Sequence, residues 1–300
     1  MQHRVPPPPL ASYLVTLAAA AAASVAAATS LQGALPEGAA TGAATATLVR
    51  AALEPALVRA PGGGDAIAIS VTVAPQWHIY WRNPGDSGAA PAVKLQLPEG
   101  WTSGELAYPR PEVFGDSDER TFGYSGTVHL LVPVKRPEGW QGNLDVQGEL
   151  SWLACKRSCV SGRSALGGSI ATEPAAMSDP PASRAWPKPL PPGASVSLYG
   201  DGNSRTLAAS IPDLAESAKV RFIPDDCAGI RWGEGTGPFD LQWDGPTRLW
   251  TLKTPLAVTP EDAPGRAPRA RGLFLVGGEP SGPAIFVDIP VPTAPTLTKP

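Results

Sequence analysis

Residues 66–73 have the sequence AIAISVTV, which alternates large apolar side chains with small or polar ones. Successive side chains of a β-strand point to opposite faces of a sheet, so this period of two predicts a strand with one buried face. The same alternation recurs in three later stretches, separated by turns that contain proline or glycine: 93–97, 128–134 and 144–152. A series of short alternating strands is typical of a β-sandwich.

The composition also favours an all-β fold. The chain of 300 residues has 32 glycines and 36 prolines, which leave few uninterrupted stretches for long helices. Its formal net charge is −3, and no block of like charge marks a surface for nucleic acid. We therefore predict an all-β protein without a nucleic-acid partner.

Residues 1–28 are typical of a secretory signal peptide. They hold one charged side chain, Arg4, and an apolar stretch from Leu10 to Ala28 that is mostly alanine. The stretch is just long enough to span a bilayer, so an uncleaved anchor is the alternative. Because alanine is weakly hydrophobic and Ala26–Ala28 offers the small residues that cleavage needs, we expect export to an oxidising compartment and a mature chain without an integral membrane span.

We expect two domains after this segment, since the chain exceeds the usual length of one. Residues 29–44 are small and polar and predict a flexible lead, followed by a first β-sandwich at 45–172. Residues 173–193 contain seven prolines and are typical of a stiff linker. A second β-sandwich is expected at 194–295, with one two-turn helix at 212–219. The sequence does not show the role of this second domain.

The spacing of Cys155 and Cys159 carries the main chemical signal. On an extended strand, residues four apart lie about 13 Å from each other, beyond the limit of about 7 Å for a disulfide, so a bridge between them requires a turn. Closing so short a loop removes little entropy from the unfolded chain. Lys156 and Arg157 lie between the cysteines, and their charges favour a thiolate and faster exchange. The pair is therefore a candidate redox site.

Other chemistries fit the sequence less well. A structural disulfide is one alternative, although in β-sandwiches such bridges typically join residues far apart in sequence. A metal site is disfavoured because His78 and His129, the two histidines after the signal, form no ligand pattern with the cysteines. No G-x-S-x-G motif indicates a hydrolase, and we expect no cofactor. Cys227 follows two aspartates, which disfavour its thiolate and predict an inert thiol.

Five motifs in order along residues 45–172 resemble the N-terminal periplasmic domain of DsbD-type thiol:disulfide interchange proteins, especially the ScsB-like branch. They are WHIYWRNPGDSG at 77–88, LPEGW at 97–101, PEVFG at 111–115, FGY at 122–124 and SWLACKRSC at 151–159. The resemblance implies an immunoglobulin-like sandwich in which Cys155 and Cys159 are the redox pair. It also implies that the pair takes electrons from a membrane-embedded thiol reductase of the DsbD or CcdA kind. The acceptors would be periplasmic proteins of the thioredoxin-like or disulfide-isomerase-like kind.

The resemblance further implies the residues around the sulfurs. Glu112–Gly115, with Glu112 and Phe114, would be a cap loop that shields them, and His78 and Tyr80 would line the site from a neighbouring strand. For Phe114 the alternative is ordinary sandwich core, and for His78 a surface histidine. We expect Trp77, Trp81 and Trp101 to lie in the core, because sandwiches need large inward side chains.

Two functions therefore follow from the sequence. The first is a detached relay arm, without the transmembrane and thioredoxin-like modules of the family, that exchanges thiols and disulfides in the periplasm. The second is a non-catalytic, secreted binding module in which the same bridge is structural. A redox titration of the cysteine pair separates the two.

Overall fold

A computed structural model describes residues 48–115, 119–175, 185–201, 204–225, 230–232, 235, 237–258, 268–277 and 282–291. All 19 regular elements given for this part of the chain are strands, so the prediction of an all-β protein is confirmed. Among the described residues, no helix is long and apolar enough to cross a membrane. The expected signal peptide, the flexible lead before residue 45 and Cys227 lie outside the described residues.

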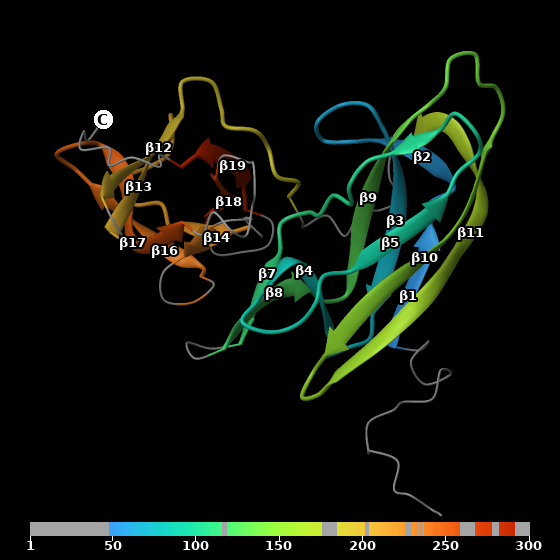
Figure 1. The fold of residues 1–300 in the computed structure, drawn as a ribbon, viewed down its shortest axis with the longest axis horizontal. Coiled ribbons are helices and arrows are strands. Elements are labelled where there is room, and N and C mark those ends of the chain that lie inside the picture. The colour runs from blue at the N-terminus through green and yellow to red at the C-terminus, as the bar shows by residue number, and fades with distance from the viewer. Residues whose placement is uncertain are drawn as a thin grey trace, which may run out of the picture. The chain divides into compact units, whose positions relative to one another are not determined.

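The first sheet contains eleven strands (Figure 1). They are β1 (Val49–Leu53), β2 (Ala56–Arg59), β3 (Asp65–Val73), β4 (His78–Gly85), β5 (Ala92–Gln96), β6 (Thr102–Ser103), β7 (Glu112–Gly115), β8 (Arg120–Tyr124), β9 (Thr127–Lys135), β10 (Leu144–Cys155) and β11 (Cys159–Ala175). Their order is β6-β9-β3-β2-β11-β10-β4-β8-β7, while β1 pairs with β3 and β5 with β10. The alternating stretches found in the sequence correspond to β3, β5, β9 and β10.

The first sheet folds into two layers, and strand β11 pairs with a strand of each. Its first part pairs with β10, and its last residues pair with β2 in parallel at Ala171 and Ala175. The apolar faces of both layers meet in one core, to which β3 contributes Ile67 and β10 contributes Leu150, both fully buried. Trp81 and Trp101 belong to this core and Trp77 packs against it, so the expectation for these tryptophans is confirmed.

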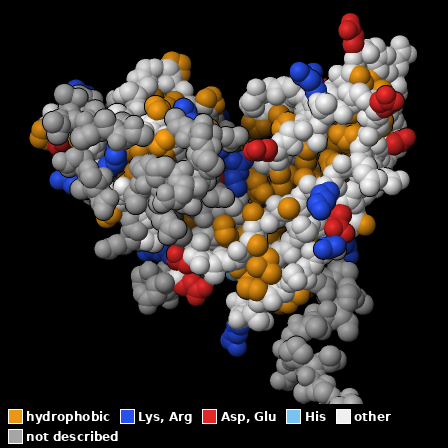
Figure 2. Space-filling model, in the orientation of Figure 1, with side chains coloured by type: hydrophobic (Ala, Val, Ile, Leu, Met, Phe, Trp, Pro, Cys, Tyr) orange, Lys and Arg blue, Asp and Glu red, His pale blue; other side chains and the backbone are white. Residues whose placement is uncertain are grey.

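The outer face of β3 is more buried than its alternation predicts. Ala66 and Ala68, which alternate with the core residues, are themselves fully covered. They pack with Leu131 of β9, and Trp186 packs against the same cluster. Because these side chains are small, the segment that carries Trp186 packs over this face, which the alternation predicts to be exposed to solvent. Elsewhere on the sheet, hydrophobic side chains show at the surface near β9 and β5 (Figure 2).

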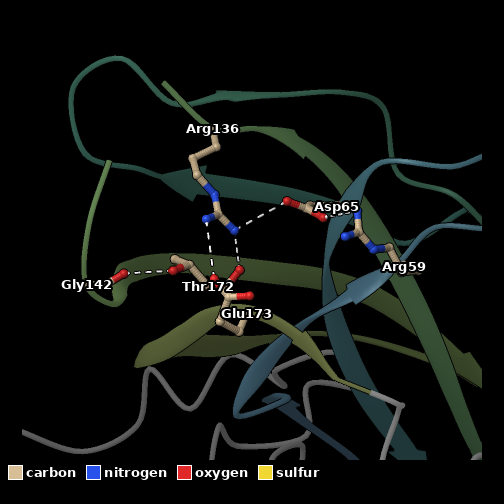
Figure 3. Close-up of polar contacts among 6 residues, drawn as sticks. All are labelled: Arg59, Asp65, Arg136, Gly142, Thr172 and Glu173. Atoms are coloured by element: carbon tan, nitrogen blue, oxygen red, sulfur yellow. Dashed lines mark hydrogen bonds and ion pairs between the residues drawn. The ribbon is translucent and has the colours of Figure 1, made fainter. Parts of the chain in front are cut away.

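The last residues of β11 are held by an arginine (Figure 3). The guanidinium of Arg136 donates to the carbonyl oxygen of Thr172 and lies 3.5 Å from the carboxylate of Asp65. The hydroxyl of Thr172 in turn donates to the carbonyl oxygen of Gly142, at 2.8 Å. These contacts fix the end of the β10–β11 hairpin that lies farthest from the cysteines.

The second sheet contains eight strands in the order β12-β13-β17-β16-β14-β18-β19, with β15 paired to β17. They are β12 (Ser195–Asp201), β13 (Ser204–Ser210), β14 (Val220–Pro224), β15 (Ile230–Trp232), β16 (Phe239–Asp244), β17 (Leu249–Val258), β18 (Arg269–Val276) and β19 (Ala284–Pro290). The helix predicted at 212–219 is wrong, because this segment forms turns. Asp213 there has a φ of 60°, a left-handed conformation that no α-helix contains.

The division into two domains stays a prediction. Strand β11 extends to Ala175, so the first residues of the expected proline-rich linker continue a strand. Lys188, within the same expected linker, forms a parallel bridge with Ile285 of β19. The described part of this segment therefore contacts both sheets, since Trp186 packs against the cluster on the outer face of β3.

Candidate functional site

The β10–β11 hairpin brings the two cysteines together. The strands pair over twelve positions, from Leu144 opposite Ile170 to Cys155 opposite Cys159. Only the three residues between the cysteines form the turn, and the disulfide closes across it with a Cα–Cα distance of 4.2 Å. This is the turn that the spacing requires. Cys155 is 5% exposed, whereas Cys159 is exposed, so an incoming thiol meets Cys159 first.

Strand β4 supplies the aromatic side chains beside the disulfide. It pairs with the end of β10, so that His78 lies opposite Cys155. Because strand side chains alternate, Tyr80 shares a face with His78, and their rings meet edge to face with centroids 5.3 Å apart. The hydroxyl oxygen of Tyr80 lies 3.6 Å from the sulfur of Cys159. A disulfide sulfur carries no hydrogen, so in this bond the tyrosine donates.

The position of Tyr80 is closely determined. The residue is 1% exposed, and a side chain at Gly88 would strike its ring, since a Cβ there would lie 2.2 Å from a ring carbon. Burial raises the pKa of Tyr80, and the nearby charge of Glu119 acts in the same direction, against the hydrogen bond of Ser87. The phenol therefore keeps its proton at neutral pH and stays a donor to the sulfur.

Phe114 covers His78 from the other side. Their rings stack with centroids 4.3 Å apart at an angle of 13°. The segment from Glu112 to Gly115, expected as a loop, is strand β7 and pairs with β8. Phe114 is only half-buried and is not part of the core cluster. Phe114 thus lies against His78 outside the core cluster, and its role as a cap over the sulfurs stays a prediction.

Glu112 anchors the start of this covering strand. Its carboxylate accepts hydrogen bonds from the backbone amide of Ser125, at 3.1 Å, and from the serine hydroxyl, at 2.9 and 3.1 Å. Burial lowers the pKa of His78 below its usual value, and the charge of Glu112 opposes that effect. Nε2 of His78 is buried and has no hydrogen-bond partner among the described residues. The imidazole is therefore neutral at pH 7, and its buried Nε2 is unpaired within the described residues.

Lys156 and Arg157, expected to favour the thiolate, are both exposed in the turn. The ammonium of Lys156 donates a hydrogen bond to the side-chain oxygen of Gln76. Gln76 has a φ of 69°, an unusual conformation for a residue other than glycine, and lies just before β4. The lysine thus connects the cysteine turn to the strand that carries His78. Within the described residues, no three side chains of the kinds that bind metals gather into a cluster.

Two other motif residues contact a segment other than the cysteine hairpin. Arg82, farther along β4, lies 3.0 Å from the carboxylate of Asp225. The amide of Asn83 donates to the carbonyl oxygen of Pro224, at 2.7 Å. Both residues therefore connect β4 to the end of β14 and take no part in the cysteine site.

The structure thus gathers Cys155, Cys159, His78 and Tyr80 at one end of the hairpin, with Phe114 stacked on His78. Sequence reasoning missed Gln76, Gly88 and Ser125, which position these residues. Gly88 stands inside the longest motif, but no sequence pattern indicates that it packs on Tyr80. The fold and the site define a class of protein: an all-β domain in which one cysteine of a hairpin disulfide is exposed beside aromatic side chains.

The comparisons with known proteins find one family that is similar to part of the chain. Residues 48–166 match the family described as "Thiol:disulfide interchange protein DsbD, N-terminal". The match covers the strands of the first sheet up to Leu166 and includes the cysteine pair.

A solved structure extends the likeness. The N-terminal periplasmic domain of ScsB from Proteus mirabilis is similar with a TM-score of 0.50 and 20% sequence identity, over 81% of this chain and 92% of that chain. Coverage this large exceeds what the first sheet alone supplies, so the shared fold includes strands of the second. None of the curated proteins matches the chain.

The lowered pKa of His78 predicts a pH dependence of stability. Since the folded-state pKa lies below the usual 6.5, the unfolded chain binds more protons below that pH. Stability is therefore expected to fall as the pH drops from 6.5 toward the folded-state pKa. The change His78→Asn should flatten the profile over this window, measured by urea unfolding at several pH values. An unchanged slope, or an NMR titration of His78 centred above 6.5, would contradict the prediction.

The stacking of Phe114 predicts faster access of small thiols. The change Phe114→Ala uncovers His78 beside the disulfide, so we expect reduction by dithiothreitol to accelerate by about tenfold, while the half-buried position makes the loss of stability small. Stopped-flow reduction and thermal unfolding measure the two effects. Phe114→Leu, which keeps an apolar cover, is the control. Unchanged kinetics together with a loss of about 3 kcal/mol or more would assign Phe114 to the core.

Proposed function

We propose that this chain exchanges thiols and disulfides in the periplasm. Electrons would pass through the Cys155–Cys159 pair from a membrane-embedded thiol reductase to periplasmic thiol proteins. The observation that carries the proposal is the unequal exposure of the two cysteine residues at a hairpin tip, with Tyr80 bonded to the sulfur of the more exposed one. The matching family and the signal-like N-terminus support the compartment.

The exchange is a pair of displacements at sulfur. A thiolate of the donor attacks Sγ of Cys159, forming a mixed disulfide while the bond to Cys155 breaks and Cys155 leaves as a thiolate. The donor's second thiolate then attacks the donor sulfur of the mixed disulfide and releases Cys159 as a thiolate. The donor becomes a disulfide, and the pair gains two electrons and takes up two protons. The reverse sequence reduces an acceptor disulfide.

Three side chains assist these steps by position. Tyr80 donates to the sulfur of Cys159 and stabilises negative charge there when Cys159 leaves. His78 lies opposite Cys155, and its unoccupied Nε2 is suited to take a proton from the buried thiol when the disulfide forms again. Phe114 covers His78 and limits access to this flank.

A redox titration tests the proposal. We expect the disulfide to equilibrate with a thioredoxin-class dithiol at a potential above about −300 mV, the range of labile bridges. Thiol labelling followed by mass spectrometry measures the reduced fraction. A potential well below that range would instead support the binding module with a structural disulfide. Two free thiols in protein isolated from the periplasm would exclude a stable oxidised state.

A further inference from the structure

Strand β11 has an edge without a paired strand next to the exposed Cys159. From Cys159 to Ile170 its only paired neighbour is β10; β1 lies close to β11 without pairing to it, and the pairing with β2 begins at Ala171. Among the described residues, no backbone hydrogen bond fills the other side of this segment. Figure 1 shows β11 along the outer side of its sheet. The free edge thus starts at the redox sulfur itself.

The register shows which backbone groups face that edge. Residues opposite each other in an antiparallel pair lie about 5.5 Å apart when they exchange hydrogen bonds and about 4.5 Å apart when they do not. The 4.2 Å between Cys155 and Cys159 therefore marks a pair without mutual hydrogen bonds. The amide and carbonyl of Cys159 point outward, and by alternation so do those of Ser161, Arg163 and Ala165.

This edge lacks the usual protection against pairing. Natural edge strands are guarded by short length, prolines, bulges or outward charges, especially lysine. β11 is 17 residues long, and residues 160–169 include no proline and no lysine. The single charged side chain of this stretch is Arg163. It lies 3.6 Å from Glu149 on the adjacent β10, so its guanidinium extends toward β10 and away from the free edge. An edge left open in this way suits an added strand.

The two flanks of the disulfide differ. On the β4 side, the outward backbone of Cys155 already pairs with His78, and Phe114 stacks above that histidine. On the β11 side, Cys159 is exposed and no strand is paired with it in the described part. A macromolecule that reaches Cys159 from the open flank does not displace the aromatic side chains. The free edge is therefore the side from which the backbone of a partner can approach Cys159.

We propose that the edge from Cys159 to Ala165 is the docking surface for a partner thiol protein, which adds an extended segment carrying its reactive cysteine as a strand beside β11. This inference rests on the exchange function proposed above. Paired strands lie about 4.7–4.9 Å apart, and residues opposite each other have Cα atoms within the range that a disulfide spans. Pairing would therefore hold the partner's cysteine in reach of Cys159, while the edge itself tolerates varied partner sequences because it binds backbone.

The test removes one outward donor of the edge. Ser161→Pro deletes an amide that makes no bond within the sheet, and edge strands tolerate proline. Ser161→Ala keeps the amide and is the matched control. With thioredoxin as the probe, we expect reduction of Ser161→Pro to be about tenfold slower than that of Ser161→Ala. Reduction by dithiothreitol, which needs no strand, should be the same in both variants.

Hydrogen exchange gives a second readout that does not depend on the proline variant. Cys155→Ser, joined through Cys159 to a single-cysteine thioredoxin, should protect the amides of Ser161 and Arg163 about tenfold more than its glutathione adduct does. Equal protection in the two adducts, or equal thioredoxin rates for the two Ser161 variants, would overturn the docking surface. If thioredoxin and other protein dithiols leave the wild-type disulfide intact, the exchange function itself fails.

Discussion

Replacing Cys159 with serine is expected to abolish thiol–disulfide exchange completely. Cys159 is the exposed member of the pair, so under the proposed function its loss removes the sulfur that a partner would attack and leaves Cys155, which is 5% exposed. Cys155→Ser should abolish turnover as well, but its remaining Cys159 stays accessible. Incubation with periplasmic extract, followed by mass spectrometry of the covalent adducts, should therefore trap partners with Cys155→Ser and few or none with Cys159→Ser.

The same two variants measure how much the bridge stabilises the fold. The loop between the cysteines is short, and the hairpin around it already pairs over twelve positions. Loss of the disulfide is therefore expected to cost about 2 kcal/mol or less in the free energy of unfolding. A much larger cost together with full biological activity in both variants would favour the structural bridge and the binding module. The double variant Cys155→Ser/Cys159→Ser controls for an unpaired thiol.

The long strands and the turn between the cysteines could be predicted from the sequence because each depends on local pattern. Strands β3, β9 and β10 alternate apolar and polar residues along one chain segment, and one face of each packs in the core. The separation of Cys155 and Cys159 limits a bridge between them to a turn, whatever the rest of the fold. Local sterics are enough for such inferences.

The surroundings of the disulfide depend on contacts between distant segments. Phe114 and His78 stack across strands β7 and β4, and no period in the sequence relates them. β7 has four residues, too few to show an alternation, and a sequence resemblance suggested a loop there. Gln76 meets Lys156 only because the turn before β4 lies beside the cysteine turn. Such pairings are set by tertiary structure, which a single sequence does not display.

Glycine at position 123 illustrates how closely the strands under the site must approach. It lies opposite Tyr80 where β8 pairs with β4. A Cβ added there would lie 2.0 Å from the carbonyl oxygen of Ile79 and 3.1 Å from the Cα of Tyr80. Both neighbours are backbone atoms, which do not rotate away as a flexible side chain does. An alanine at this position therefore forces β8 away from β4.

We accordingly expect Gly123→Ala to cost about 3 kcal/mol or more in the free energy of unfolding, because overpacking against backbone breaks strand pairing. Since β4 carries His78 and Tyr80, the same shift should disturb the bond from Tyr80 to Cys159 and slow exchange with a protein dithiol. Gly167→Ala, in β11 of the same sheet, is the matched control. Its Cβ would meet only the carbonyl oxygen of Val146, at 3.9 Å, so a change within about 0.5 kcal/mol is expected. Urea unfolding of the two variants compares them directly, and equal stabilities would show that β8 and β4 separate without cost.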